Sequence, residues 1–554
     1  MAKIETDNNA VIKYLCLIIV AVLVNSIGMF SPVLSSNDAY FYSVMSKSVV
    51  TSNNWGWLFY QGQDWLDKPH FPFWMTALSF KLLGISVFAF ILPGFIFNLI
   101  GAVYTYRLAK EFFDFETAVI SALIYVTSLH LMISAIDIRA EAFLLGQIIP
   151  ACFYLWRFNI TSRSKHLVLA SFFTGLALMT KGLFVLFTIC SGQLIYLIYV
   201  RKLNFTFIKK IVYYVLLSFV FALPEFICLY TQFDMHPEKV VFGKSGISGI
   251  EWYFWGSQFG RFFNNGPIAM TNKHGDPLFF VHTFLWSFLP WSLFFIFAIY
   301  YFIKKRLEII SYDFPKVIYL LAAFIPTFLM FSLTKFQLDY YINIIIPFAA
   351  ILCAYLLNYF VLPKWFLKIQ TGLNIALLLI GMILTLFIFK LSLYSLYVFV
   401  PCALLFVMVK NIKRCINKES VIIFSSLAIS NIFVILMLIY RTIYPTFATG
   451  LNVANYFTEN NISSKKLYVV GDVNYNMLDF YVNNMKLDFV NQIDGIKDTN
   501  YYVLVNSNNQ PIINNLKNAH QLKEFSDISI NRFIPMLLSN KKEDISYYQL
   551  YKVN

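Results

Sequence analysis

Long apolar segments recur along the whole chain, and they constrain its fold more than any other feature. A hydrocarbon core about 30 Å thick needs roughly 20 apolar helical residues to cross it. Thirteen segments approach or reach that length: 11–30, 86–108, 117–135, 141–159, 167–181, 183–200, 209–230, 278–303, 316–333, 339–360, 366–389, 392–410 and 420–440. The pattern therefore predicts an all-α polytopic membrane protein with about 13 transmembrane helices. The apolar segment 72–84 is too short to span and is expected to lie along the interface.

The composition supports this prediction. Of the 554 residues, 59% are hydrophobic and only 13% are charged, whereas soluble proteins carry roughly 25% charged residues. The net charge of +14 would suit a nucleic-acid partner, but the Lys and Arg residues form short clusters between apolar segments. We therefore interpret them as topology signals and expect no nucleic acid. None of the seven cysteines falls in the C-terminal tail, so neither a disulfide framework nor a CxxC metal site is indicated.

The distribution of basic residues predicts the orientation. In or beside one alternate set of loops lie 21 Lys and Arg residues. The four short loops of the other set hold one each, Arg139, Lys181, Lys335 and Lys390. The positive-inside rule then places the N-terminus in the cytoplasm, and thirteen crossings place the C-terminus on the external side of the membrane.

The tail differs in character from the rest of the chain. Strand-like runs LYVVGDV, TNYYVLVN and ISYYQLYKV alternate with the segments DFYVNN and PIINNLKNAH, which are expected to form short helices. Two parts are predicted: a transmembrane domain at 1–444, with external loops 31–85 and 231–277, and a soluble external α/β domain at 445–554. The tail is expected to act as a structural cap or to bind substrate.

Ionisable residues gather on the predicted external face. The first loop carries Asp38, Asp67 and Lys68, and the third span ends in Asp137 and Arg139. Further basic residues follow at Lys181, Arg261 and Lys335, together with His274. Ionisable groups near membrane depth usually face a cavity or one another. Cations neutralise a phosphate, and a carboxylate accepts a proton, so this set suits a site for a lipid-linked anion.

Structural roles are the alternative for each residue. Asp38 is a good N-cap for a helix beginning near Ala39. Asp137 and Arg139 are able to form an exposed ion pair of little consequence. The side chains of Lys68, Lys181 and Lys335 are long enough to reach the interface without binding a ligand.

The order of these features resembles the polyprenyl-phosphate-dependent glycosyltransferases of the C superfamily. It is most similar to the lipid A aminoarabinose transferase branch, which is related to protein O-mannosyltransferases. The resemblance rests on motifs in chain order: Asn37-Asp38-Ala39, Trp65-Leu66-Asp67-Lys68-Pro69, Asp137, Lys181-Gly182, Arg261 with His274, and Lys335 with Tyr340-Tyr341. This chain has Asn37-Asp38-Ala39 where relatives often carry Asp-Glu-Ala, and Asp67-Lys68-Pro69-His70 in place of Glu-Lys-Pro-Pro.

The resemblance implies roles for these residues. Asp38 and Asp137 would be catalytic, and Lys68, Arg261 and Lys335 would bind the donor phosphate. Substrate would contact a further group, Asp67, Arg139, Lys181, His274, Tyr340 and Tyr341. The donor would be a polyprenyl-phosphate-linked sugar, with an amino sugar as one option.

The acceptor implied is lipid A or another envelope glycolipid. An enzyme like the protein O-mannosyltransferases, or one acting on another envelope glycan, is the alternative. A lipid or sugar transporter is the alternative of another class, but it predicts polar groups near mid-membrane and repeated halves. No ligand cluster for a divalent metal stands out among the carboxylates, because hard cations need several converging oxygens.

Overall fold

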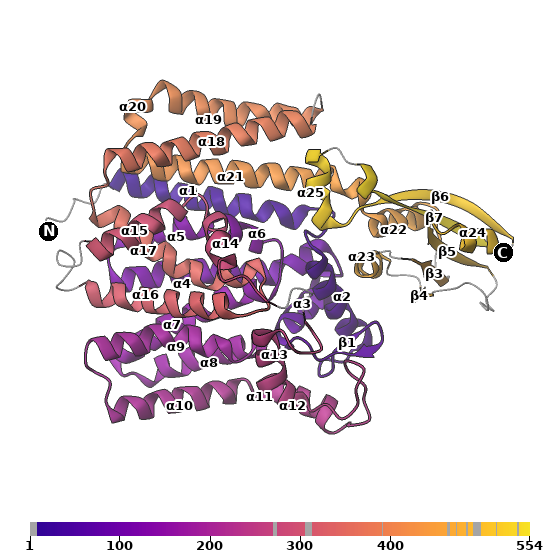
Figure 1. Cartoon of the computed structure of the whole chain (residues 1–554), viewed down its shortest axis with the longest axis horizontal. Helices are drawn as coiled ribbons and strands as arrows, with labels where there is room; N and C mark the ends of the chain where they lie inside the picture. The colour runs from indigo at the N-terminus through magenta and orange to yellow at the C-terminus, as the bar shows by residue number, and fades with distance from the viewer. Residues whose placement is uncertain are drawn as a thin grey trace.

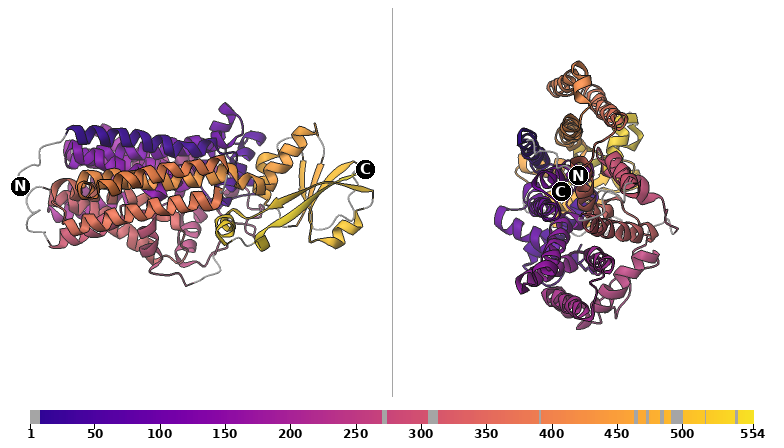
Figure 2. Two further views of the ribbon diagram at one scale, coloured as in Figure 1. Left: turned by 90° about the horizontal axis from the view of Figure 1, so that it is seen from above. Right: turned by 90° about the vertical axis from the view of Figure 1, so that its left-hand side faces the viewer.

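The computed structural model describes residues 8–269, 274–304, 313–389, 392–462, 466–471, 474–482, 486–490, 500–516, 518–539 and 542–554. Lys390, used above for orientation, lies outside these ranges. The helices run side by side in a long bundle, and a sheet extends from the end of the bundle opposite the start of the first described helix (Figure 1). Figure 2 shows the same elongated arrangement from above and, in its second view, the helices end-on along the bundle axis.

Each of the thirteen predicted segments overlaps one or two helices. They are α1 (Asn8–Ser26) with η1 (Ile27–Phe30), α4 (Val87–Phe112), α5 (Phe115–Val126) with α6 (Leu129–Ser134), α7 (Ala140–Thr161), α8 (Ser164–Lys181), α9 (Phe184–Tyr199), α10 (Phe205–Phe221) with α11 (Leu223–Leu229), α14 (Phe279–Ser287) with α15 (Ser292–Lys304), α16 (Phe314–Leu333), η4 (Asp339–Ile345) with α17 (Ile346–Tyr359), α18 (Lys364–Phe389), η5 (Leu393–Val398) with α19 (Phe399–Lys410), and α21 (Lys418–Thr442).

Within the described ranges, eight of these helices are long and apolar enough to cross a bilayer, or ten if the bent pairs α10–α11 and α14–α15 each count as one span. The other predicted spans, formed by α5 with α6, by α8 and by α9, do not meet both criteria. The mostly helical membrane fold is therefore confirmed, with eight to ten spans by length and composition.

Burial distinguishes the centre of the bundle from its edge. The span formed by η4 and α17 is 94% buried, whereas η5 with α19 is only 11% buried. Because lipid can contact apolar side chains directly, α19 does not need to be buried within the protein, and it lies at the periphery of the bundle (Figure 1). The central position of η4 and α17 brings the residues at their start to the middle of the site.

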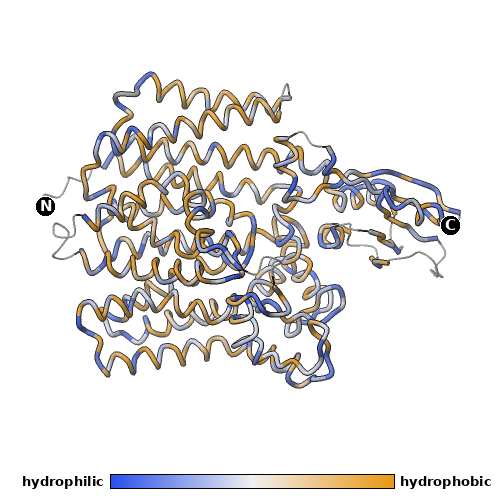
Figure 3. The backbone as a smooth tube through the Cα atoms, in the orientation of Figure 1, coloured by the Kyte–Doolittle hydropathy of each residue, from blue (hydrophilic) through white to orange (hydrophobic). Residues whose placement is uncertain are grey.

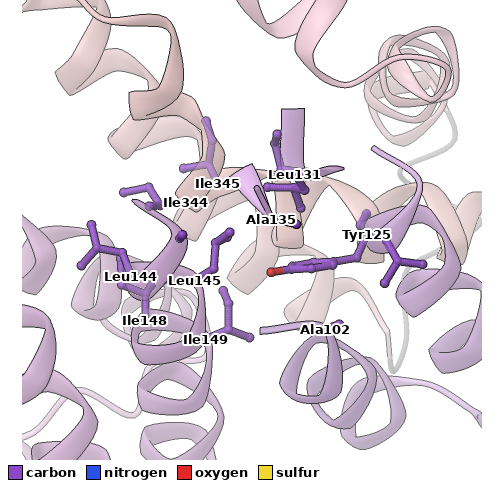
Figure 4. Packing of buried hydrophobic residues seen from close by; sticks show 14 of the residues in the cluster. Ala102, Tyr125, Leu131, Ala135, Leu144, Leu145, Ile148, Ile149, Ile344 and Ile345 are labelled. Carbon is purple, nitrogen blue, oxygen red and sulfur yellow. The ribbon is translucent and has the colours of Figure 1, made fainter. Parts of the chain in front are cut away.

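The central helices α4 and α7 approach closely through glycines. A Cβ on Gly101 of α4 would lie 3.1 Å from the Leu145 carbonyl oxygen of α7, and one on Gly146 of α7 would meet the Phe97 carbonyl oxygen of α4 at 2.4 Å. Small residues allow such close packing in membranes, where no hydrophobic force drives helices together. Side chains of α5, α7 and η4, among them Tyr125, Leu145 and Ile344, fill the surrounding core (Figure 4).

Shorter elements cover the end of the bundle nearest the sheet. In chain order they are α2 (Asn37–Ser52), β1 (Phe59–Tyr60), β2 (Gln63–Asp64), α3 (Phe71–Leu83), η2 (Tyr230–Asp234), α12 (Gly249–Glu251), η3 (Trp252–Gly256) and α13 (Ser257–Phe263). The helix expected at 72–84 is α3. At the other end, α20 (Ile412–Cys415) joins α19 to α21.

A mixed sheet follows the last membrane helix. Its strands lie in the order β4 (Lys486–Phe489), β3 (Lys466–Val470), β5 (Tyr501–Asn506), β7 (Ser546–Val553), β6 (Ala519–Asp527). β3 is parallel to β4 and β5, while β7 is antiparallel to β5 and β6. The accompanying helices are η6 (Tyr444–Phe447), α22 (Thr449–Glu459), α23 (Tyr475–Tyr481), α24 (Gln510–Asn515), α25 (Ile530–Ser539) and η7 (Lys542–Asp544).

Three strands of this sheet, β3, β5 and β7, lie where the sequence predicts them. The predicted helix PIINNLKNAH is partly wrong, since its last two residues, Ala519 and His520, begin β6. Figure 3 shows hydrophilic backbone in the sheet region and in the loops at both ends of the bundle, with mostly hydrophobic helices between them.

Candidate active site

The N-terminus of α2 is fixed by a serine that the sequence analysis did not select. Ser36 caps α2, because its Oγ accepts a hydrogen bond from the Ala39 N–H at 3.0 Å. The same hydroxyl donates to Oδ1 of Asp137, which precedes α7. The capping role considered for Asp38 is therefore wrong: Ser36 is the cap, and Asp38 lies in the first turn with its side chain 47% exposed.

Arg139 joins the two candidate catalytic carboxylates. Its Nη1 lies 3.0 Å from Asp38 Oδ2, and its Nη2 lies 2.9 Å from Asp137 Oδ2. The guanidinium stacks 4.1 Å from the ring centre of Tyr340, whose hydroxyl donates to Asp38 at 3.3 Å. A planar guanidinium is suited to holding two acceptors and an aromatic face at once. Asp38 is the more exposed carboxylate and so the one available to a substrate.

Lys181 does not extend into the interface. It is buried and forms an ion pair with Glu141 of α7, and its Nζ lies 4.4 Å from the ring centre of Tyr341. The next residue, Gly182, has a φ of +110°, and a Cβ there would meet the Gln258 side chain at 2.3 Å. The turn that ends α8 therefore requires glycine. This turn also places Lys181 beside the loop that carries Arg261.

A second group of charges comes from the first external loop and α13. Arg261 forms an ion pair with the buried carboxylate of Asp67. The adjacent Lys68 has its Nζ 5.8 Å from the ring centre of Tyr42, and the described residues give it no ion pair. Burial lowers the pKa of the Lys68 amine, an effect that nearby Asp67 opposes and Arg261 strengthens. Lys68 is thus a cation whose charge has no direct partner and which an anion would stabilise.

Two cavities adjoin these charges. We call the first the phenylalanine cavity; it has a volume of about 310 Å³ and is lined mainly by Leu183, Phe184, Phe259, Phe262, Met330, Phe331 and Phe336, with Lys181, Arg261 and Tyr341 as its polar side. The second, the carboxylate cavity, measures about 140 Å³ and is lined by Asp137, Glu141 and Asp339 together with Arg139, His130, Trp286 and Tyr340. Tyr340 and Tyr341 are consecutive and border one cavity each. An apolar chamber with a cationic side therefore lies next to a polar chamber containing carboxylates.

Most of the predicted site residues come together. Asp38, Asp137, Arg139 and Tyr340 form one network, and Asp67, Lys68, Arg261, Lys181 and Tyr341 surround it. Lys335 and His274 are exceptions. Both side chains are exposed and line neither cavity; Lys335 takes part through its backbone N–H, which donates to the Phe262 oxygen at 2.9 Å.

Other site residues were missed because they lie inside apolar segments. His130 Nδ1 is 2.5 Å from Asn343 Oδ1, and its Nε2 is 3.9 Å from Asp339 Oδ2. Polar residues within a membrane span are costly and mark functional positions, so this rule would have selected all three. His70, by contrast, is buried between Glu225 and the Gly56 carbonyl and supports the loop.

Within the described ranges, no group of three or more His, Cys, Asp or Glu side chains could hold a metal ion. The carboxylates of the site are instead paired with cations.

Parts of the chain are similar in sequence to known proteins. Residues 67–227 match the family described as dolichyl-phosphate-mannose-protein mannosyltransferase. A protein of unassigned function from Aquifex aeolicus (strain VF5) is 28% identical over 375 residues, which are 66% of this chain and 67% of that protein. The undecaprenyl phosphate-alpha-4-amino-4-deoxy-L-arabinose arabinosyl transferase 2 of Proteus mirabilis (strain HI4320) is 24% identical over 339 residues, 59% of this chain and 56% of that enzyme.

The fold is also that of a solved structure. ArnT from Cupriavidus metallidurans bound to undecaprenyl phosphate superimposes with a TM-score of 0.72, at 16% sequence identity and over 97% of both chains. Its apo state gives 0.71. The resemblance stated from the sequence motifs is confirmed.

Proposed function

We propose that this chain is an ArnT-like glycosyltransferase of the C superfamily and that it transfers a sugar from a polyprenyl-phosphate donor to lipid A or a related envelope glycolipid. The donor needs an apolar chamber for isoprene units beside cations for a phosphate. The phenylalanine cavity, with Arg261 and Lys181 at its polar side and Lys68 nearby, has this combination. This juxtaposition is the observation that carries the proposal.

Lys68 and Arg261 hold the donor phosphate. Arg261 is oriented by Asp67, while Lys68 has no ion-pair partner among the described residues and is free to contact the phosphate oxygens. As the bond between the anomeric carbon and the phosphate oxygen breaks, negative charge grows on the leaving polyprenyl phosphate. Cations fixed beforehand at that position stabilise the transition state more than the ground state.

Asp38 acts on the acceptor. The acceptor oxygen attacks the anomeric carbon, and a hydroxyl acceptor must lose its proton in this step. Asp38, half exposed and oriented by Arg139 and Tyr340, is the base for that proton. Asp137 supports Asp38 because it pairs with Arg139 and accepts a hydrogen bond from the Ser36 hydroxyl. A phosphate acceptor is largely ionised at pH 7 and needs no base, so the effect of removing Asp38 reports the acceptor class.

The reaction takes place on the periplasmic face of a bacterial inner membrane. The site lies at the end of the bundle that carries the C-terminal sheet (Figure 1), and the positive-inside rule assigns that end to the periplasm. We therefore assign 1–444 as the transferase domain and 445–554 as a periplasmic domain.

Mass spectrometry of lipid A from cells with and without the protein tests this function. The proposal predicts that a glycosyl increment, an amino sugar among the options, is lost with the gene and restored by the wild-type chain but not by a Lys68→Ala variant. An unchanged lipid A spectrum, with an increment lost from an envelope protein or glycan instead, would favour the protein O-mannosyltransferase-like alternative.

A further inference from the structure

A ladder of exposed aromatic rings lies on the helical segment that closes the phenylalanine cavity. Trp255 and Phe259 stack with ring centres 5.3 Å apart, and Phe259 and Phe263 stack at 6.5 Å. Their exposed fractions are 63%, 47% and 49%. We call these residues the aromatic ridge. Burying rings of this size away from water is worth a few kcal/mol each, so full exposure to water would be unfavourable.

The opposite side of the same segment faces the site. Arg261 pairs with Asp67, and Phe262 lines the phenylalanine cavity. Phe259 belongs to both surfaces, since it also lines that cavity. Over 249–263 the only charged residues are Glu251, in the first turn, and Arg261. The segment thus has Arg261 on the side toward the site and three aromatic rings on its exposed side, while Glu251 is exposed at its start, away from both cavities.

The aromatic ridge is continuous with a lipid-facing surface. Phe254, beside Trp255, stacks with ring centres 5.6 Å from Phe226 of α11 and 6.1 Å from Phe219 of α10. These two helices are long and apolar enough to cross a bilayer if the bent pair is counted as one span, and α11 exposes Leu223 and Ile227 on its surface. In Figure 1, α11, α12 and α13 lie near the end of α10 that is closer to the sheet. The end of an apolar helix of this kind is expected at the membrane interface. Tryptophan and other aromatic rings favour this interfacial depth.

We propose that the aromatic ridge inserts into the bilayer leaflet at this end of the bundle. The segment then forms the wall between the membrane lipid and the phenylalanine cavity, with Phe259 contacting both. The ligand is the acyl and headgroup boundary of a phospholipid leaflet. A polyprenyl chain dissolved in that leaflet would pass this wall to reach the cavity, a consequence that rests on the proposed function.

Tryptophan quenching in nanodiscs tests the insertion independently of activity. The fluorescence lost in Trp255→Phe is assigned to Trp255, and its quenching is compared for phospholipids brominated on the acyl chains and for aqueous iodide. We expect quenching by brominated lipid and protection from iodide. Trp57→Phe is the control, because Trp57 contacts Lys239 in the external loop region and should be quenched by iodide alone.

Quenching of Trp255 by iodide alone would overturn the proposal. Protection of Trp255 from both quenchers, increasing with protein concentration, would also overturn it, because it would indicate that a second copy of the chain covers the ridge. If Trp255→Phe fails to fold, the variants Phe259→Trp and Phe263→Trp provide reporters on the same ridge, read as fluorescence gained over the wild type.

A kinetic measurement tests the consequence for the donor. Trp255→Ser with Phe263→Ser should raise KM several-fold for a full-length undecaprenyl donor in bilayers and leave KM for a water-soluble, two-isoprene donor unchanged. Phe406→Ser is the matched control, since Phe406 is 66% exposed on the peripheral helix α19, and it should alter neither value. Equal increases in KM for both donors would contradict the role of the ridge in lipid entry. If the wild-type protein is inactive with both donors, only the proposed function is contradicted.

Discussion

Arg139 Nη1 lies 3.0 Å from Asp38 Oδ2, so the candidate base on α2 is oriented by the residue that immediately precedes α7. The same guanidinium contacts Asp137 and the ring of Tyr340. Because lysine is a point charge without a planar fork, Arg139→Lys should keep the local charge and lose the bridge. We expect kcat to fall at least about tenfold, which is the rate effect of roughly 1.4 kcal/mol, with little change in donor KM.

Steady-state kinetics of Arg139→Lys against Asp137→Asn checks this. Asp137→Asn keeps its contact geometry but removes one of the two negative charges, and it should cost less than Arg139→Lys. Wild-type kcat in Arg139→Lys would show that the bridge does not orient Asp38.

Lys68 gives the site a dependence on alkaline pH. Its folded-state pKa is lowered by burial from the usual value of 10.5, so its charge is lost at a lower pH than that of an exposed lysine. Between the lowered pKa of the folded state and the ordinary pKa of the unfolded state, Lys68 is protonated only in the unfolded chain. The contribution of Lys68 to the free energy of unfolding therefore rises with pH in that window. Donor binding has the opposite trend, because the phosphate needs the charged amine.

Calorimetric titration of undecaprenyl phosphate at increasing pH checks the Lys68 prediction. Affinity should weaken as pH passes the lowered pKa of Lys68 but hold to higher pH in Lys68→Arg, whose guanidinium stays charged. If Lys68 takes up a proton when the donor binds, the measured binding enthalpy should vary with the ionisation enthalpy of the buffer. This variation should disappear in Lys68→Arg. Identical pH profiles for the two proteins would contradict the assignment.

The buried Lys181–Glu141 pair should be sensitive to loss of one partner. Removing one member of a buried ion pair leaves an unpaired charge and costs about 3–5 kcal/mol. Lys181→Met alone should therefore lower the thermal midpoint in detergent markedly, whereas Lys181→Met with Glu141→Leu should recover most of it. The double variant should remain poorly active because the cationic side of the phenylalanine cavity is lost. Equal midpoints for single and double variants would show that the pair is not coupled.

The C-terminal region contacts the residue next to Asp38. Asn474 Nδ2 donates to Asn37 Oδ1 at 2.9 Å, and Asn474 also caps α23. Asn474→Ser should keep the cap but be too short to reach Asn37, and it should lower kcat several-fold. Asp479→Asn, which breaks the Lys47–Asp479 ion pair at the same interface, is the control and should change the thermal midpoint without changing kcat.

A double-mutant cycle separates positioning from simple stability. Asn37→Ala, Asn474→Ser and the double variant should lower kcat by the same factor, because each removes the same hydrogen bond. Additive losses, or losses that follow the thermal midpoint, would mean that the contact only holds the two parts together.

Sequence patterns predicted the membrane fold and most of the site for separate physical reasons. Spans are visible because lipid tolerates long apolar runs, and Asp38, Lys68 and Asp137 stand out because charges at membrane depth need a partner or a ligand. The pairings were not predictable: the Ser36 bridge to Asp137 and the Lys181–Glu141 pair depend on how α2, α7 and α8 pack. Lys335 carried the same charge signal as Lys181, but the backbone at the end of α16 leaves its side chain exposed.

Transfer by the purified protein tests the central claim most directly. Wild-type protein in nanodiscs would be given an undecaprenyl-phosphate sugar and acceptor lipid A, and released undecaprenyl phosphate and glycosylated acceptor would be measured together by mass spectrometry. We predict equal amounts of the two products, and a loss of about 100-fold or more in kcat/KM for Lys68→Ala, as expected when a group that stabilises transition-state charge is removed. Transfer at the wild-type rate by Lys68→Ala, Asp38→Asn and Asp137→Asn would contradict the assignment of the site.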